Sequence, residues 1–351
     1  MSSAALRDGI LAVPVVDITS FRMPYADAAA RSAVVRQVDE AARTVGFMQV
    51  TGHGIPATTL ADFTAATDAF FALDPRAKAR YRCPPGINRG YTPPKAESLA
   101  NSLGLASTAD LFEAINVGTS IDDFPALDLP EDVYARNVYP ADEVPGFEDA
   151  VGDWFQAAGR VARTMVRIFG VALGGREDYF EQFTDHSIDV LRMNNYCLPD
   201  PETELERDRL GMGAHTDYGI VTVLWADQVP GLEIHGADGC WHPVMPAEGA
   251  LLVNLGDATA RWTNDEWMST LHRVVPPKVN GALVPRRSAA YFHDGNVDAV
   301  IRCLPGCVSE ANPARYEPVT VGEHLAAKLA GSRAGELNPH AAREAARLRA
   351  I

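Results

Sequence analysis

Cysteine is scarce in this sequence of 351 residues, and it is not arranged as a disulfide framework. The number is odd and no CxxC pair occurs; the five positions are Cys83, Cys197, Cys240, Cys303 and Cys307. Disulfide scaffolds are short, secreted chains with an even and dense set of cysteines, whereas cytoplasmic thiols stay reduced. The pattern therefore predicts free thiols in a reducing cytoplasm.

Positive charge and long apolar runs are also lacking. Lysine and arginine total 31 against 46 acidic residues, a formal net charge of -15. This balance disfavours nucleic acid and anionic membranes as partners, because phosphate binding requires clustered cations. The sequence contains no run of about 18 apolar residues, so we do not expect a membrane span. Its start, MSSAALRDGILAVPVVDI, lacks the basic region and the apolar run of a signal peptide. We expect a cytoplasmic protein with a small-molecule partner, and the oligomeric state stays open.

No repeat, low-complexity tract or Gly/Ser-rich linker divides the chain, and its 47% hydrophobic content suffices for a large core. We predict a single domain over 1–351. Its parts would be a helix-rich N-terminal region (1–130), a β-rich core (187–310) and C-terminal helices (318–351).

The first half has the apolar spacing of helices. One helix is predicted to end at Gly46, a good helix terminator, and a second covers about 58–72. The third has apolar residues spaced by four and three over about six turns: Phe147, Val151, Trp154, Ala158, Val161, Met165 and Ile168. These helices would flank the core.

From Asp189 the apolar period shortens. Short β-branched or apolar runs alternate with Gly, Pro, Asn and Asp, as in IDVLRMNNYC, GIVTVLWA, GLEIHG, GALLVNLG, STLHRVV and RSAAYFH. Many short strands at this spacing favour an antiparallel sandwich or jelly roll. After Pro318 the pattern returns to helix, where Thr320 and Glu323 form a capping box. The predicted fold is mainly β with flanking helices.

His215 and Asp217 stand two apart in GAHTDYG. On a strand these positions point to one face, so an imidazole and a carboxylate could share a metal ion. A third ligand from a distant strand would complete a set of two histidines and one carboxylate, which suits Fe(II) in oxygenases. Of the nine histidines we choose His272, in the predicted strand STLHRVV. Taken alone, an HxD pair is common and a strand histidine is usually a core residue.

A second set of polar residues has the same spacing. Arg286 and Ser288 stand at i and i+2 on one predicted strand, and Asn194 and Tyr196 on another. An arginine fork with a neighbouring hydroxyl suits a planar carboxylate, and a tyrosine can add a hydrogen bond. Each residue alone is explained equally well by ordinary sheet packing.

Together these residues resemble the isopenicillin N synthase-like group of the 2-oxoglutarate/Fe(II)-dependent dioxygenase superfamily, over nearly the whole chain. The first half contributes VPVVDIT (13–19), GFMQVTGHGIP (46–56), FFALDPRAKARY (70–81), RGYTPP (89–94) and DLFEAINVG (110–118). The second contributes NNY (194–196), HTD (215–217), VNLGDATARWTNDEWMSTLHRV (253–274) and RRS (286–288). The resemblance implies a double-stranded β-helix, or jelly roll, as the catalytic core.

The resemblance also implies a role for each residue. His215, Asp217 and His272 match the iron ligands, and 2-oxoglutarate and dioxygen would be the cosubstrates. Further residues match positions around the cosubstrate and the substrate: Arg286 and Ser288 at the distal carboxylate, Tyr196 beside them, Asn194 near the keto acid, and Phe292 next to the substrate. The interval from His272 to Arg286 is a few residues longer than usual and Arg287 is adjacent. We prefer Arg286, because it shares a strand face with Ser288.

The predicted reaction is oxidation of a small organic substrate, by hydroxylation, desaturation or ring closure, in secondary metabolism, with release of succinate and CO2. The carboxylate of Asp217 argues against a halogenase, which needs that position for halide. An oxidase of the same fold that does without 2-oxoglutarate, or an ethylene-forming enzyme, is the main alternative. A metal-binding jelly roll without catalysis and a zinc hydrolase are the alternatives from other classes. The region from Lys95 to Asp132 and the helices after Pro318 are expected to cover the mouth of the site.

Overall fold

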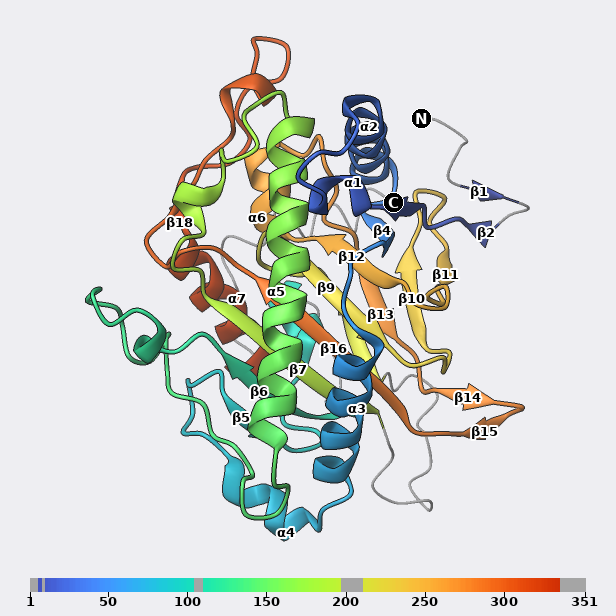
Figure 1. Ribbon diagram of the computed structural model, residues 1–351, viewed down its shortest axis with the longest axis vertical. Coiled ribbons are helices and arrows are strands. Elements are labelled where there is room, and N and C mark those ends of the chain that lie inside the picture. The colour runs from blue at the N-terminus through green and yellow to red at the C-terminus, as the bar shows by residue number, and fades with distance from the viewer. Residues whose placement is uncertain (1–5, 8–9, 104–109, 197–210, 335–351) are drawn as a thin grey trace.

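A computed structural model describes residues 6–7, 10–103, 110–196 and 211–334 (Figure 1). Cys197 and the predicted helical tail over 335–351 lie outside the described residues.

Two β-sheets form the centre of the molecule. The larger has the strand order β3 (Val15–Asp17), β4 (Phe47–Thr51), β12 (Leu251–Leu255), β9 (Val221–Ala226), β16 (Arg286–His293), β7 (Asp189–Tyr196), β6 (Glu113–Gly118) and β5 (Gly90–Thr92). The smaller has the order β11 (Trp241–Pro243), β10 (Leu232–His235), β13 (His272–Val274) and β8 (Met212–His215). Pairing is antiparallel except between β3 and β4, which are parallel.

The two sheets face each other. Phe47 and Leu252 of the large sheet pack in one apolar cluster with Met212, Ile234 and Val274 of the small sheet. From β7 to β16 the chain passes repeatedly between the two sheets, with β10 and β11 forming a pair within the smaller one, and this arrangement is the predicted jelly roll. The fold class, mainly β with flanking helices, is confirmed.

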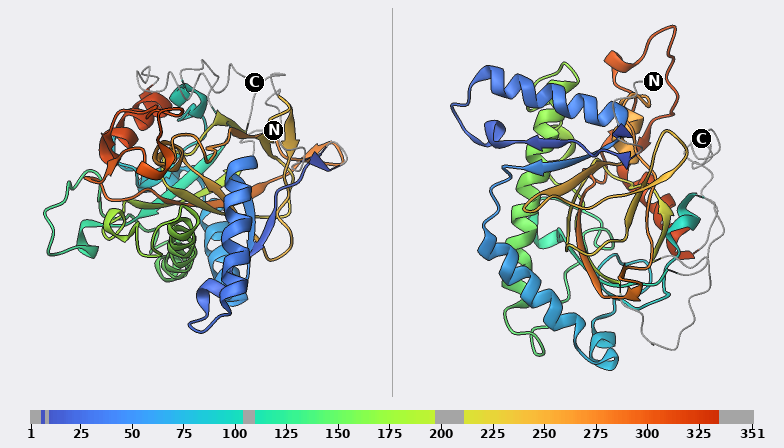
Figure 2. Two further views of the ribbon diagram at one scale, coloured as in Figure 1. Left: turned by 90° about the horizontal axis from the view of Figure 1, so that it is seen from above. Right: turned by 90° about the vertical axis from the view of Figure 1, so that its right-hand side faces the viewer.

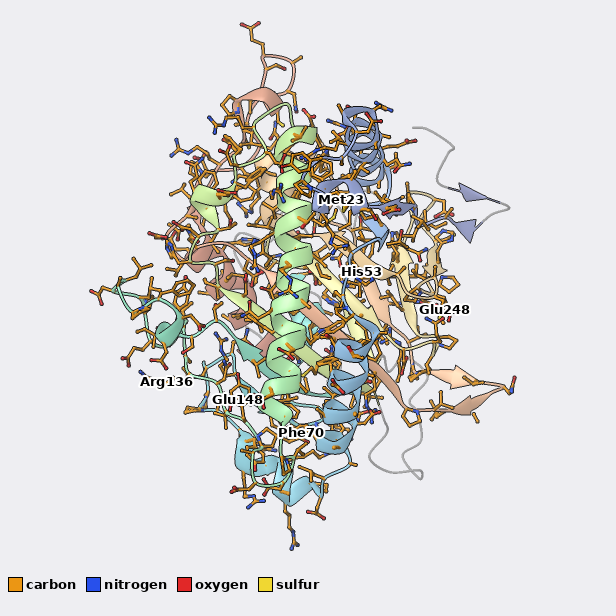
Figure 3. All side chains as sticks on the ribbon, in the orientation of Figure 1. Met23, His53, Phe70, Arg136, Glu148 and Glu248 are labelled. Atoms are coloured by element: carbon orange, nitrogen blue, oxygen red, sulfur yellow. The ribbon has the colours of Figure 1, made fainter. Side chains whose placement is uncertain are left out.

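Three long helices cover the outer face of the large sheet: α2 (Ala28–Thr44), α3 (Ala57–Phe71) and α5 (Phe147–Ala172). The predicted stripe of α5 is buried, and its Trp154 stacks on Phe63 of α3 with ring centroids 4.8 Å apart. Phe70 lies where α3 meets the first turn of α5 (Figure 3), with its ring centroid 5.7 Å from that of Phe147. As predicted, α2 stops before Gly46, whose φ of +70° favours glycine.

The remaining elements are short or lie near the C-terminus. They are β1 (Leu6–Arg7), β2 (Ile10–Leu11), α1 (Thr19–Arg22), α4 (Pro75–Lys78), α6 (Asp257–Trp262), β14 (Lys278–Val279), β15 (Ala282–Leu283), β17 (Val300–Ile301), β18 (Val319–Thr320) and α7 (Val321–Ala334), with 3-10 turns such as η3 (Leu99–Leu103). Helix α7 lies on the other side of the strands from α2, α3 and α5 (Figure 2).

The C-terminal segment begins later as helix than the sequence suggested. Val319 and Thr320 first pair with β17 as a two-residue strand. The capping box then forms as predicted: the Glu323 amide donates to Thr320 Oγ1 (3.2 Å), and the Thr320 amide donates to Glu323 Oε2 (3.0 Å).

Two negative findings concern the described residues alone. None of their helices combines the length and the apolar character needed to cross a bilayer. Their four cysteines, Cys83, Cys240, Cys303 and Cys307, form no disulfide.

Candidate active site

A cavity of about 840 Å³ lies between the two sheets. Strands β7, β9 and β16 form one wall and β8 and β13 the opposite one. Two further segments line the cavity, one with Ala96, Glu97 and Leu99 and the other with α7 residues from Gly322 to Ser332. Both belong to the regions that the sequence predicts to cover the mouth of the site, and that covering role stays a prediction.

His215, Asp217 and His272 converge on one point in the cavity. Their ligand atoms lie within 4.8 Å of one another, and no other such cluster of His, Cys, Asp or Glu occurs among the described residues. Cross-strand pairing of His215 with His272 brings the two rings together. Asp217 Oδ1 lies 3.8 Å from Nε2 of His215 and 3.7 Å from Nε2 of His272. All three side chains are buried.

Each histidine is oriented through its other ring nitrogen. Nδ1 of His215 lies 2.8 Å from the Gly213 carbonyl, and Nδ1 of His272 lies 3.1 Å from the Thr270 carbonyl. Because a carbonyl only accepts hydrogen bonds, Nδ1 carries the proton in each ring. The lone pairs on Nε2 therefore face the cluster, which is how metal-binding histidines are usually oriented. Burial, and next the neighbouring His272, lower the pKa of His215 to about 3, so its ring stays neutral.

The Asp217 carboxylate is held in the same way. Its Oδ2 accepts hydrogen bonds from Thr222 Oγ1 (2.5 Å) and Asn254 Nδ2 (2.6 Å). Its Oδ1 is left facing the two Nε2 atoms. Two imidazole nitrogens and one carboxylate oxygen that converge on one point match the donor set that suits Fe(II) in oxygenases.

Asp217 does not lie on a strand, so the prediction of a shared strand face with His215 was wrong. Strand β8 ends at His215, and Asp217 lies in the connection to β9. The chain has to turn there, and Gly219 packs against Asp294 so closely that a Cβ would clash. Asp217 is fixed instead by the hydrogen bonds to its carboxylate and by the Asp257 amide, which donates to its carbonyl (2.8 Å).

Arg286 extends into the cavity from β16, and it is 2% exposed. Its Nε donates to the Val229 carbonyl (3.2 Å), and its guanidinium lies 5.2 Å from the Tyr196 ring centroid. Its Nη1 is buried and has no hydrogen-bond partner among the described residues. A buried guanidinium nitrogen that is unsatisfied costs free energy, so this atom marks a place for an acceptor such as a carboxylate.

Arg287 lies on the opposite face of β16. Its Nε donates to Asp68 Oδ1 (2.9 Å) on α3, its Nη1 contacts Asn195, and its guanidinium lies over the Phe71 ring. It does not line the cavity. The choice of Arg286 on the grounds of strand face is therefore consistent with the structure.

The other residues predicted around the cosubstrate lie beside Arg286. Register pairs Arg286 with Tyr196 and Ser288 with Asn194. Asn194 Nδ2 lies 3.4 Å from Ser288 Oγ, and a contact of the Tyr196 hydroxyl with Ser288 adds to the grouping. One guanidinium group, from Arg286, and two hydroxyl groups, from Ser288 and Tyr196, therefore lie together at one end of the cavity.

Phe292 lines the same cavity further along β16 and is only half-buried. Register places it opposite Thr222, the residue that holds Asp217. Phe292 therefore lies beside the cluster of His215, Asp217 and His272, near the opposite end of β16 from Arg286; its predicted place on the substrate side of the iron stays a prediction.

A buried ion pair on the cavity wall was not among the predicted site residues. Arg192 Nη2 lies 2.7 Å from Glu97 Oε2, and Arg192 Nε donates to Asn194 Oδ1 (3.2 Å). Arg192 stands two before Asn194, so the alternation of β7 already pointed it inward. Glu97 comes from the covering segment, and no local pattern indicated its partner. Thr222 and Asn254 were missed for the same reason.

Models of two protein families match the chain. One, described as the N-terminal part of a non-haem dioxygenase in morphine synthesis, covers residues 13–142. The other, the 2OG-Fe(II) oxygenase superfamily, covers residues 188–295.

Relatives match along most of the chain. The 2-oxoglutarate-Fe(II) type oxidoreductase hxnY of Emericella nidulans is 32% identical, over 88% of this chain and 87% of its own. A homoarginine-6-hydroxylase of Oryza sativa is 31% identical, over 84% and 88%. The crystal structure of a full-length Neurospora crassa protein in complex with alpha-KG and thymine has a TM-score of 0.80 at 27% identity, covering 94% of this chain and 99% of that one.

Fold, donor set and comparisons define a non-haem Fe(II) oxygenase. The chain belongs to the 2-oxoglutarate/Fe(II)-dependent dioxygenase superfamily, whose members use Fe(II), 2-oxoglutarate and O2. It is an enzyme of that type.

Proposed function

We propose that His215, Asp217 and His272 bind the iron and that Arg286, with Ser288 and Tyr196, binds the distal carboxylate of 2-oxoglutarate. The observation that carries the proposal is the unsatisfied Nη1 of Arg286, buried in the same cavity as the three converging donors. When bound, the iron would activate dioxygen, convert 2-oxoglutarate to succinate and CO2, and oxidise a C–H bond of the substrate.

The protein's own part is placement. Thr222 and Asn254 would hold one oxygen of Asp217 so that the other faces the metal. The carbonyls of Gly213 and Thr270 would fix the histidine tautomers. Asn194, bridging Arg192 and Ser288, would separate the keto-acid end from the substrate end. These contacts remove the need to reorganise the site during turnover.

We propose a small, planar, carbonyl-bearing substrate. Phe292 would offer a ring to stack on, and Arg192, held by Glu97 and Asn194 and paired in register with Ala290, lines the same cavity. Asp294 also lines the cavity, and burial raises its pKa well above its usual value, so it would stay protonated and donate. The similarity to the Neurospora crassa protein, whose structure was solved with thymine, supports this class. Hydroxylation is the expected outcome, with desaturation or ring closure as variants, in secondary metabolism.

The test is a mass-spectrometric screen for succinate formation coupled to substrate loss. The panel would hold nucleobases, small aromatic ketones and acids, and amino acids, with Asp217→Ala as the control without iron. We expect a planar carbonyl compound to stimulate succinate formation. Oxygen uptake and product without succinate would instead show an oxidase that does not use 2-oxoglutarate. Turnover of aliphatic amino acids alone would refute the substrate class.

We propose that the enzyme acts in the cytoplasm on a small molecule, not on nucleic acid or a membrane. The acidic balance of the sequence and the absence of disulfides among its described cysteines support this. Cell fractionation with an antibody against the native protein tests the compartment, and recovery in a secreted or membrane fraction would contradict it.

A further inference from the structure

Helix α7 lines the cavity, and two of its side chains also hold the chain next to Asp217, one directly and one through Asp257. One face of it is buried, and that face includes His324 and Lys328, which are 4% and 0% exposed. Histidine and lysine are seldom buried to this degree without a partner. Their partners belong to the segment that carries His215 and Asp217, or contact it directly.

Lys328 forms a wholly buried ion pair with Asp257 of α6. Its Nζ lies 2.8 Å from Asp257 Oδ2, and neither side chain is exposed. The same carboxylate oxygen accepts a hydrogen bond from Thr216 Oγ1 (3.0 Å), and the Asp257 amide donates to the Asp217 carbonyl (2.8 Å). Asp257 thus holds the chain on both sides of the Asp217 amide, and Lys328 supplies the charge that lets a carboxylate stay there.

His324 reaches the next residue along. Its Nε2 lies 3.0 Å from the Tyr218 carbonyl, so it donates to the peptide between Tyr218 and Gly219. Burial lowers the pKa of His324 to about 3, and the ring is a neutral donor at physiological pH. Tyr218 is held at its other end as well, by contacts of its hydroxyl with Ser102 and Ser332.

We propose that Lys328 and His324 are positioning residues for the iron, which hold the turn from Thr216 to Tyr218 so that Asp217 Oδ1 faces the two histidines. This inference rests on the proposed ligand set. It makes the metal site dependent on a docked α7, and Leu325 and Leu329 of that helix line the substrate cavity. The same helix would then form part of the cavity wall and hold the iron-binding turn in place.

The test measures metal affinity, by anaerobic calorimetry with Fe(II) and by absorption with Co(II) as an air-stable probe. His324→Leu removes the hydrogen bond to Tyr218, and Lys328→Met removes the buried ion pair with Asp257. Either change should raise the dissociation constant about 10- to 100-fold, the usual effect of losing a residue that orients a ligand. His324→Gln can still donate to the carbonyl and should stay within about threefold of the wild type.

Val321→Ala is the matched control, because Val321 is buried on the same helix and packs near Gly295, and its aliphatic side chain can make no hydrogen bond or ion pair with the metal-binding turn. It should lower the melting temperature and leave the dissociation constant unchanged. If His324→Leu and Lys328→Met melt like Val321→Ala and bind metal like the wild type, the contacts only stabilise the fold and the proposal is refuted. If Lys328→Met does not fold, the contrast between His324→Leu and His324→Gln decides. If Asp217→Ala binds metal like the wild type, the ligand set itself is wrong, which is a separate failure.

Discussion

Replacing Arg286 tests how the cosubstrate is bound, because the neighbouring Arg287 serves as an internal control. Arg286 is buried in the cavity with Nη1 unsatisfied, whereas Arg287 pairs with Asp68 outside it. Arg286→Lys keeps the positive charge but removes the planar fork that binds a carboxylate through two hydrogen bonds. We expect this variant to fold and to bind 2-oxoglutarate weakly.

The size of the effect follows from the hydrogen bond that Arg286→Lys removes. A hydrogen bond between charged groups contributes about 1.5–3 kcal/mol. Since about 1.4 kcal/mol corresponds to a tenfold change, the apparent constant for 2-oxoglutarate should rise about 10- to 150-fold. Arg287→Lys removes part of a surface ion pair with a well-exposed partner, worth about 0–1 kcal/mol of stability. Its constant for 2-oxoglutarate should equal that of the wild type.

The assay has two parts. Succinate formation against 2-oxoglutarate concentration gives the apparent constant, and anaerobic titration of the Fe(II) protein with 2-oxoglutarate gives binding without turnover. A sensitive Arg287 with a tolerant Arg286 would show that the assigned strand face is wrong. An unchanged Arg286→Lys would show that the unsatisfied nitrogen has another purpose, and an oxidase that does without 2-oxoglutarate would then be favoured.

Further predictions follow from the same geometry. His215→Ala, Asp217→Ala and His272→Ala should each abolish turnover and reconstituted iron content, and normal iron in any one variant removes that residue from the site. Phe292→Ala should raise the substrate constant about 2- to 12-fold, since ring stacking contributes about 0.5–1.5 kcal/mol, while substrate-free 2-oxoglutarate decarboxylation persists; an equal loss of both would make Phe292 a packing residue. Burial raises the pKa of Asp110 to about 6, so the folded protein binds this proton more tightly than the unfolded chain does. The gain in folding stability is complete below about pH 4 and is lost as pH rises through 6. Melting temperatures of Asp110→Asn measured against pH should lack this dependence. Thiol titration of the denatured protein should find five free thiols. In the native state, exposed Cys240 should be alkylated long before buried Cys307, because burial raises the pKa of Cys307 to about 11. Equal alkylation rates would contradict the burial of Cys307.

Residues that share a strand were predictable from the sequence. Alternation on β16 and β7 correctly brought Arg286, Ser288, Asn194 and Tyr196 to one wall, because a regular strand fixes the face of each side chain. The helix stripe of α5 was predictable for the same kind of reason. The single-domain organisation over 1–351 and the roles of the individual residues stay predictions.

Contacts between distant segments were not predictable. Glu97 and Arg192, or Asp257 and Lys328, form pairs only because the covering segments fold back over the jelly roll. Nothing local distinguishes Lys328 from a solvated lysine on a helix. Asp217 shows the intermediate case: the motif identified the residue, but its position depends on a turn and on side chains from β9 and β12.

The arrangement of β16 explains why its register has to be fixed from both sides. Its inward positions line the cavity in order, from Arg286 at the proposed cosubstrate end to Phe292 at the proposed substrate end. Its outward positions hold the helices: Arg287 lies over Phe71 of α3, and the Tyr291 ring packs on Phe155 of α5. A slip of one residue would exchange the two sets, placing Tyr291 in the cavity and Arg286 against the helices. The strand pairs along its whole length with β7 and over most of it with β9, and the Tyr291 hydroxyl donates to buried Asp189 (2.6 Å). Because these outward contacts penalise a slip in the absence of any ligand, the fold alone sets the spacing between the Arg286 guanidinium and the Phe292 ring.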